Sequence, residues 1–278
     1  MNRIVVETVT KDCRHGRFTF MPHDAFVGRS LDVYGEFAEH EVQLFQKLLR
    51  PGDVVVEAGA NIGALTVPIA RAVGAAGKVI AYEPQGVLAH LLAANLAANG
   101  LANVEVRRAG LGAASGTIRV PAIDYSRAGN FGGVSIGAPA ETRGHAVALE
   151  TLDGLGLAAL AFVKIDVEGM ELAVLEGGDR TVRALRPILF VENDRTARSA
   201  ALIAHLLALG YALWWHITPL FNRRNFFGAT EDVVHGVCSF NMLCLPPERG
   251  IAIANGLAVT GPDDDWSKAL ARAPGNAP

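Results

Sequence analysis

The sequence predicts an α/β fold of the Rossmann-like kind, with a mostly parallel seven-stranded sheet, helices on both faces and a small N-terminal extension. Short apolar runs alternate with helical segments from residue 54 to residue 245. A glycine-containing turn follows the first run, and acidic residues end four of the runs. Continuous apolar strands that alternate with helices are typical of a parallel sheet buried on both faces.

The first 50 residues are predicted to form the extension, packed on the core. Residues 18–20 indicate a short strand, and apolar residues recur at helical spacing over 37–49. Pro51 and Gly52 end this helix and begin the core domain, which we expect over residues 51–250. The C-terminal tail spans 251–278, and we expect it to fray after Gly261.

Within the core domain, strands and helices alternate in a simple order. The predicted strands are 54–56, 78–82, from 104, 161–166, 187–192, 211–215 and 237–245, and the predicted helices end near 72 or span 87–99, 170–185 and 196–209. Residues 113–150 interrupt this alternation. The glycine-rich stretch 128–133 within them predicts a flexible loop over the site.

Composition narrows the classes of partner and compartment. The chain has 278 residues, 50% of them apolar, with 25 Lys and Arg against 28 Asp and Glu. This balance gives no basic field for nucleic acid or an anionic membrane. The N-terminus lacks the apolar core of a signal peptide, and the apolar stretch 200–215 is too short to span a bilayer. We expect a cytoplasmic protein with free cysteines, and a homodimer stays an option.

The sharpest motif is the turn at residues 57–63, where an open α/β sheet binds its ligand. Gly59 permits a tight turn, Gly63 belongs to the same loop, and the amides at the helix start can receive a carboxylate. A dinucleotide-binding loop would have glycine where this chain has Asn61 and Ala64. The glycine that is missing at position 61 would make room for a pyrophosphate. S-adenosylmethionine has no pyrophosphate, so the loop favours S-adenosylmethionine over NAD. A plain glycine turn is the alternative.

The second strand ends in Glu83 and Pro84, and Glu83 lies 24 positions after Gly59. An acidic residue at this place can accept hydrogen bonds from both ribose hydroxyls of a cofactor. Ala109, which follows the third strand, and Asp166 are assigned to the same cofactor pocket.

Carboxylates end four of the predicted strands: Glu57, Glu83, Asp166 and Glu192. Parallel strands place their carboxyl ends at one edge of the sheet, so these acids converge and repel one another unless a cation is bound there. The sulfonium of S-adenosylmethionine supplies one positive charge, and a metal ion is the rival explanation.

Over residues 35–245 the chain resembles the FkbM family of methyltransferases. The matching segments are PGD at 51–53, EAGANIG at 57–63, YEP at 82–84, TLD at 151–153, KIDVEG at 164–169 and VLEGG at 174–178. Later segments, among them NFFG at 225–228 and SFNMLC at 239–244, look like those of a bacterial branch of the family. The usual family form has Asp where this chain has Glu57, whose longer side chain should still reach the methionine amino group.

The resemblance implies a class I methyltransferase fold, S-adenosylmethionine as cofactor and O-methylation of a sugar or natural-product small molecule. A hydroxylated acceptor must lose a proton, so a base is useful. We assign Asp166 or Glu192 as base or acceptor-orienting group, and Lys164 as a group that polarises the acceptor or pairs with a carboxylate. His216 is a further candidate base, with a satisfied histidine at the core edge as the alternative.

The remaining predicted residues are assigned to acceptor binding: Phe131, Glu168, Asn193, Trp215 and Asn225. Aromatic residues are more often plain core than pocket, and Glu168 could equally serve the helix that follows it. No residue is assigned as a metal ligand.

Four rival functions stay open. In one, Asp166, Glu192 and Asn193 chelate Mg²⁺ in a metal-assisted O-methyltransferase. N-methylation on the same fold is another. An NAD(P)-dependent oxidoreductase is disfavoured by Asn61, and a non-catalytic binding protein is possible because fold does not fix function.

Overall fold

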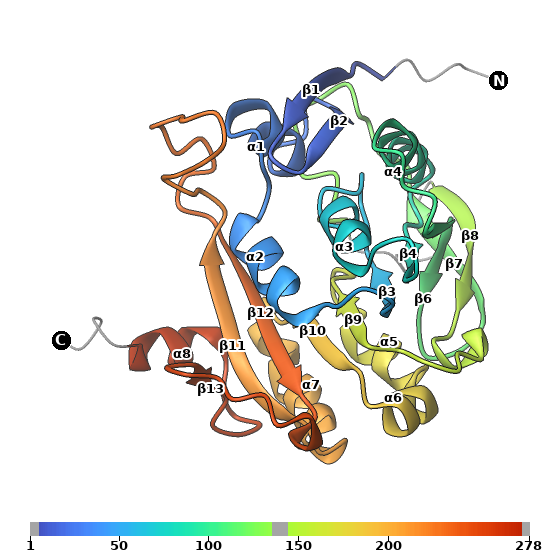
Figure 1. The fold of residues 1–278 in the computed structure, drawn as a ribbon, viewed down its shortest axis with the longest axis vertical. Coiled ribbons are helices and arrows are strands. Elements are labelled where there is room, and N and C mark those ends of the chain that lie inside the picture. Colours follow the sequence, from blue (N-terminus) through green and yellow to red (C-terminus); the bar gives the residue numbers. More distant parts are fainter. Residues whose placement is uncertain (1–5, 135–143, 274–278) are drawn as a thin grey trace.

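A computed structural model describes residues 6–134 and 144–273 (Figure 1). Its central sheet has the strand order β13-β11-β12-β10-β9-β3-β4-β5. These strands are β3 (Val54–Ala58), β4 (Lys78–Tyr82), β5 (Val104–Arg107), β9 (Phe162–Ile165), β10 (Ile188–Glu192), β11 (Ala212–Pro219), β12 (Cys238–Leu245) and the two-residue β13 (Leu257–Ala258). The five strands from β10 to β5 run parallel, and β12 runs antiparallel to β10 and β11. The predicted α/β fold is confirmed, with β13 as an additional short edge strand.

Helices cover both faces of this sheet (Figure 1). One face carries α2 (Glu39–Leu48), α3 (Thr66–Val73) and α4 (Gly86–Ala98); the other carries α5 (Glu171–Glu176), α6 (Asp179–Leu185) and α7 (Thr196–Ala208). Successive strand residues point to opposite faces. Val55 therefore packs in the core under α2 and α3, whereas Val56 packs in the core over α5 and α7.

The N-terminal extension consists of a hairpin and two helices that close one end of the sheet. The hairpin strands β1 (Val9–Cys13) and β2 (Gly16–Phe20) are followed by α1 (Val27–Val33) and α2. The Asn95 side chain on α4 accepts a hydrogen bond from the Thr19 N–H at 2.7 Å and donates to the Thr19 carbonyl at 3.1 Å. The extension is thus bonded to the core domain.

Residues 113–150, which interrupt the predicted alternation, contribute to a second, small sheet. It consists of β6 (Ala109–Leu111), β7 (Gly116–Pro121) and β8 (Gly144–Glu150), in the order β6-β8-β7. The chain that follows β7 returns to the main sheet, where the Gln85 side chain donates to the Phe131 carbonyl at 2.7 Å. This segment also pairs with the N-terminal extension through Asp24 and Gly129.

Two predictions about elements are wrong. The single helix expected over 170–185 is divided into α5 and α6 at Gly177 and Gly178. A Cβ atom at Gly177 would fall 2.0 Å from the Gly112 carbonyl oxygen, so the helix breaks where another segment approaches closely. The tail does not fray directly after Gly261, because α8 (Trp266–Arg272) forms and Asp264 is buried beneath it with two bonds from the Arg272 guanidinium.

The remaining observations concern the length of the helices, the cysteines and two short turn helices. None of the helices in residues 6–134 and 144–273 is both long and apolar enough to cross a bilayer. Cys13, Cys238 and Cys244 are free thiols. The short turn helices η1 (Asp153–Leu155) and η2 (Pro247–Arg249) complete the described elements.

Candidate active site

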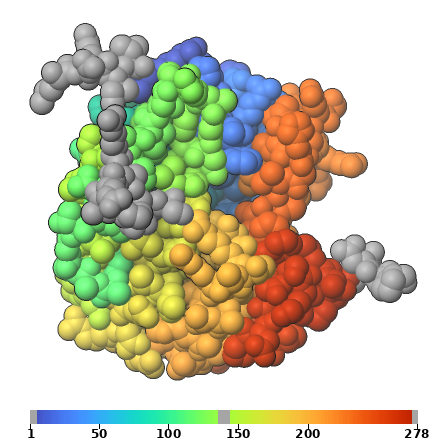
Figure 2. Space-filling model, turned by 180° about the vertical axis from the view of Figure 1, so that it is seen from behind, coloured from blue at the N-terminus to red at the C-terminus, as the bar shows by residue number. Residues whose placement is uncertain are grey.

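A cavity of about 410 Å³ lies at the carboxyl ends of the parallel strands. Its walls come from α1 and α2, the loop after β3, the chain after β7 and the first residues of β12. Figure 2 shows the N-terminal extension beside the chain that joins β11 to β12, with the surface hollowed next to them. Eight predicted site residues line the cavity: Glu57, Gly59, Asn61, Glu83, Lys164, Asp166, Glu168 and Glu192.

The loop between β3 and α3 has a left-handed backbone at three predicted positions. The φ angles are +84° at Gly59, +53° at Asn61 and +89° at Gly63. Asparagine tolerates this conformation better than most residues with a side chain, so Asn61 replaces a glycine here at low cost. Gly63 does not reach the cavity but packs against the side chain of Leu92. The backbone at position 61 therefore adopts the left-handed conformation typical of glycine, although the residue there is Asn61.

The amides of this loop fall into two groups. Those of Gly59 and Ala60 donate to the Tyr82 carbonyl at 3.0 and 2.9 Å, and that of Asn61 donates to Glu83. The amides of Ala64 and Leu65, which line the cavity just before α3, have no acceptor within the described chain. The expected amides for a ligand carboxylate are thus those immediately before the helix, not those of the turn itself.

Glu57 is fully buried and only half satisfied. Its Oε2 accepts a hydrogen bond from the Thr66 hydroxyl at 2.7 Å, whereas Oε1 has no partner in the described structure. Burial raises the pKa of Glu57, and the nearby Lys164 opposes that rise. A buried carboxylate oxygen without a donor is costly, so this atom fits a ligand ammonium such as the methionine amino group.

Glu83 holds the turn together with both of its oxygens. Its Oε2 accepts from the Asn61 N–H at 2.9 Å and Oε1 from the Gln85 N–H at 2.8 Å. Burial raises the pKa of Glu83 to about 7 although these two donors favour the charged form. The carboxylate is therefore fixed in place at the end of β4, with lone pairs left for ribose hydroxyls.

A narrow side cavity continues from this carboxylate. It shares Gly59, Glu83 and Asp166 with the main cavity and adds Pro84 and Ala109, two of the predicted cofactor residues. The structure therefore brings the predicted residues of both cavities to one edge of the sheet.

Lys164 is the central cation of the site. Its side chain is 3% exposed, and Nζ donates to Asp166 Oδ2 at 3.0 Å and to the Gly59 carbonyl at 3.3 Å. Burial acts to lower the pKa of Lys164, but the attraction of Asp166, Glu57 and Glu41 outweighs it and the pKa is raised. Lys164 therefore stays charged and positions Asp166.

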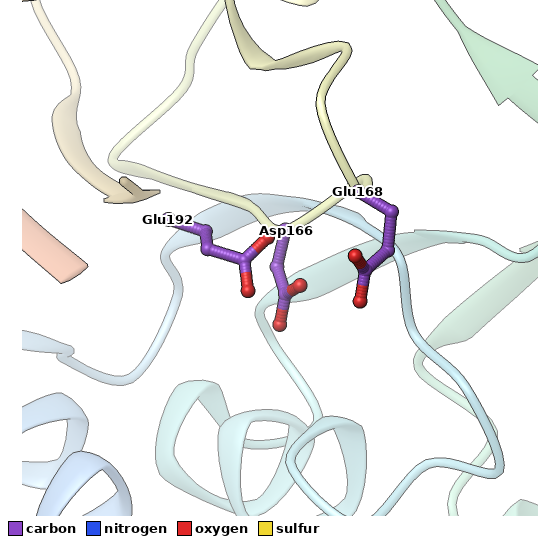
Figure 3. A group of neighbouring side chains, drawn as sticks. All are labelled: Asp166, Glu168 and Glu192. Carbon is purple, nitrogen blue, oxygen red and sulfur yellow. The ribbon is translucent and has the colours of Figure 1, made fainter. Parts of the chain in front are cut away.

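Asp166, Glu168 and Glu192 form an acidic cluster beside the lysine. One oxygen from each carboxylate lies within 4.8 Å of the others, and all three side chains point into one space (Figure 3). Glu168 is paired with Arg195 at 2.6 Å. Burial, followed by the charge of Asp166, raises the pKa of Glu168 to about 7.

Glu41, a residue of α2 that lines the cavity, is not among the residues predicted from the sequence. Its Oε1 accepts hydrogen bonds from the Ser239 hydroxyl at 2.6 Å and from the Asn241 side-chain amide at 3.1 Å. Burial raises the pKa of Glu41 to about 7. Ser239 and Asn241 lie within the β12 segment quoted for the family resemblance, but no local pattern marks Glu41.

Several predicted residues lie outside the cavity. Trp215 faces away from it and donates from its indole N–H to Asp264 at 3.2 Å. The Asn225 side chain bonds its own loop at Asn222 and Ala229, and Asn193 donates to Ser199.

Phe131 and His216 also stay outside the cavity. Phe131 packs against Tyr125 with ring centroids 5.0 Å apart, while its neighbours Asn130 and Gly132 line the cavity. His216 packs on Phe190 at 5.4 Å, and burial lowers the pKa of His216 to about 4. This placement agrees with a histidine at the core edge, but its buried Nδ1 has no hydrogen-bond partner among the described residues, so the histidine is not satisfied as the alternative expected.

The chain is similar to known methyltransferases in sequence and in structure. The model of the methyltransferase FkbM domain matches residues 57–213. No curated protein sequence matches. An FkbM methyltransferase structure from Methylobacillus flagellatus is 19% identical over 74% of this chain, with a TM-score of 0.46, and this chain covers 50% of its length.

Two other solved structures are similar at comparable levels. A precorrin-6y C5,15-methyltransferase from Geobacter metallireducens is 14% identical, with 74% of this chain and 88% of that chain covered and a TM-score of 0.44. An O-methyltransferase from Thermotoga maritima is 17% identical, with 86% and 77% covered and a TM-score of 0.43.

The site and the family match agree on the cofactor. The orphan oxygen of Glu57, the amides of Ala64 and Leu65 and the fixed Glu83 carboxylate offer partners for the amino group, the carboxylate and the ribose hydroxyls of S-adenosylmethionine, in that order. The match to residues 57–213 covers more than half of the chain, and it includes the loop, Glu83 and the acidic cluster. The chain therefore belongs to the FkbM family of S-adenosylmethionine-dependent methyltransferases.

Proposed function

We propose that the enzyme methylates a hydroxyl group of a sugar or natural-product small molecule. The observation that supports this choice is the polar wall that α2 and β12 contribute to the cavity. There Glu41, Ser239 and Asn241 form a hydrogen-bonded group that lines the cavity. Among the described residues no group bonds the second oxygen of Glu41, so it is available to an acceptor hydroxyl.

The reaction needs alignment and a place for one proton. S-adenosylmethionine supplies an electrophilic methyl carbon on its sulfonium. Formation of the new carbon–oxygen bond breaks the carbon–sulfur bond, and the hydroxyl proton passes to a carboxylate. Much of the rate can come from holding the acceptor close and in line.

Three carboxylates can receive that proton in this cavity. Asp166 is held by Lys164, Glu192 belongs to the acidic cluster, and Glu41 lines the cavity from α2. A general base works best with a pKa near the operating pH, which burial provides at Glu41. We assign Asp166 to orientation of the acceptor, and Glu41 joins Asp166 and Glu192 as a candidate base.

Two assays test this proposal. Calorimetric titration with S-adenosylmethionine, S-adenosylhomocysteine and NAD⁺ should show micromolar binding of the first two and none of NAD⁺. Transfer of a labelled methyl group is then measured with a panel of glycosides, polyols and phenols and with their amine counterparts. Labelling of hydroxyl compounds is expected, and labelling of amines alone would support N-methylation instead.

Matched variants connect the activity to the cavity. Asp166→Asn and Glu41→Gln should each lower turnover at least tenfold while S-adenosylmethionine still binds. The exposed Glu231→Gln serves as the control and should keep full turnover. Full turnover in Asp166→Asn would exclude its assigned role.

A further inference from the structure

The acidic cluster of Asp166, Glu168 and Glu192 contains one oxygen whose environment is unusual. Oε2 of Glu192 is buried and has no hydrogen-bond partner within the part of the chain that the structure describes. Figure 3 shows its carboxylate directed toward that of Asp166. A buried carboxylate oxygen that meets only other acids is costly unless something neutralises it.

The charges around Glu192 do not balance. The charged groups that act most strongly on it are all negative: Asp166, Glu168, Asp194 and Glu171. Lys164 pairs with Asp166, and Arg195 pairs with Glu168 and Asp194. Two cations therefore face five carboxylates, those of Glu192 and of the four acids that act on it. Glu192 and Glu171 have no ion-pair partner among the described residues, which leaves an excess of negative charge. The single net charge of the bound cofactor would neutralise only part of this excess.

The spacing of the cluster suits a hard cation. One oxygen from each of the three carboxylates lies within 4.8 Å of the others. Oxygens on opposite sides of a Ca²⁺ ion are about 5 Å apart and adjacent ones are closer, whereas Mg²⁺ requires a tighter octahedron. Carboxylate oxygens are the ligands that Mg²⁺, Mn²⁺ and Ca²⁺ prefer.

We propose that Asp166, Glu168 and Glu192 bind one divalent cation at the edge of the cofactor cavity. Three carboxylates leave coordination positions for water or for oxygens of the acceptor. The cation site itself is independent of the acceptor; its role in binding an acceptor oxygen rests on the proposed O-methylation. This ligand set differs from that expected from the sequence: Asn193 is not among the residues that line the cavity, its side-chain amide donates to Ser199 and Met242, and Glu168 takes its place.

A bound cation would also give the carboxylates different roles. Asp166 and Glu192 would serve as ligands, so the acceptor proton would pass to Glu41, which lines the same cavity. The alternative is that Glu192 is protonated and donates a hydrogen bond to Asp166, with no ion present. The two states differ in their response to added metal.

The test is titration of the metal-free 278-residue chain with Mn²⁺ at pH 7.5. The electron paramagnetic resonance signal of free Mn²⁺ measures how much of the ion remains unbound. One ion per chain should bind, and Ca²⁺ or Mg²⁺ should displace it. Glu192→Gln and Asp166→Asn should each weaken binding at least tenfold. Asp179→Asn, at an acid that pairs with Arg183 on α6, should leave it unchanged.

Two further measurements make each outcome decisive. Binding of S-adenosylmethionine by each variant shows that the site is folded, and Glu168→Gln provides a third variant if one of the others is not. Absence of Mn²⁺ binding, or binding that none of the three variants weakens, would overturn the proposal. Mn²⁺ binding without transfer to any hydroxyl compound would refute the proposed acceptor class alone. Undiminished O-methylation in a chelator would refute the role of the cation but not the site.

Discussion

A Cβ atom added to Gly59 would fall 1.8 Å from the backbone carbonyl oxygen of Asp166. This contact joins the cofactor loop after β3 to the segment after β9, and the Asp166 N–H bonds the Ala58 carbonyl at 3.1 Å beside it. The position of the Asp166 carboxylate therefore depends on the absence of a side chain at Gly59. Its backbone, at φ +84°, also favours glycine.

Substitution of Gly59 by alanine should disrupt both the fold at this edge and the cofactor site. We expect the free energy of unfolding to fall by roughly 1–3 kcal/mol from backbone strain alone, with a further loss from the contact. Binding of S-adenosylmethionine should become undetectable by calorimetry. Gly52→Ala is the matched control, because Gly52 has φ +94° and no atom within 4 Å of an added Cβ. Equal effects of the two substitutions would mean that the contact with Asp166 is unimportant.

Glu83→Gln should weaken cofactor binding without unfolding the protein. The two Glu83 oxygens accept from the Asn61 and Gln85 amides, and a glutamine would present an NH₂ group to one of them. Hydrogen bonds to charged groups contribute about 1.5–3 kcal/mol each, so the dissociation constant should rise roughly 10- to 100-fold. Calorimetric titration measures it. Glu105→Gln, on the exposed edge of β5, is the control that should leave affinity unchanged.

The cofactor half of the site could be predicted from the sequence because each of its residues lies at, or just after, the carboxyl end of a strand. In a parallel sheet the ends of neighbouring strands meet, so Glu57, Glu83, Asp166 and Glu192 converge without any knowledge of tertiary contacts. The left-handed backbone at Asn61 agrees with this reasoning, since asparagine is one of the few residues able to replace a glycine there.

The acceptor half could not be predicted in the same way. Glu41 and its partners Ser239 and Asn241 are 198 and 200 positions apart in the chain and meet only in the folded protein. The placement of Trp215 also depends on a contact between residues that are distant in the sequence. Adjacent strand residues face opposite sides, and the partner of Trp215 is Asp264, in the tail expected to fray.

Replacement of Lys164 by methionine should strongly destabilise the protein. The lysine is the buried cation that faces Asp166, Glu57 and Glu41, so its loss leaves carboxylates without compensation. Removal of one partner of a buried ion pair typically costs about 3–5 kcal/mol. Urea unfolding at pH 7.5 measures the change.

Two comparisons separate this charge effect from a loss of packing. The deficit of Lys164→Met should shrink at pH 5, because protonated carboxyl groups no longer need the cation. Lys78→Met removes a half-exposed partner of Glu105 and should cost less than about 1 kcal/mol. A deficit that does not change with pH would point to packing as its cause.

The buried acids also predict how stability depends on pH. Burial raises the pKa of Glu41 and of Glu83 to about 7, from 4.5 for an ordinary glutamate. Between these values the unfolded chain holds fewer protons than the folded one, so the contribution of each group to stability falls as pH rises through this window. It is fully present below pH 4.5 and lost above pH 7. The cofactor-free protein should therefore lose stability between pH 5 and pH 8.

Glu41→Gln isolates one of these contributions, because glutamine mimics the protonated carboxyl group and still accepts a bond from Ser239. The variant and the wild type should have similar unfolding free energies at pH 5, whereas the variant should be more stable by on the order of 1–3 kcal/mol at pH 8. Urea unfolding at the two pH values gives this difference. Glu231→Gln, at an exposed position, should follow the wild type throughout. A difference between Glu41→Gln and the wild type that stays constant from pH 5 to pH 8 would show that Glu41 is already ionised in the folded protein, and it would remove Glu41 as a base matched to neutral pH.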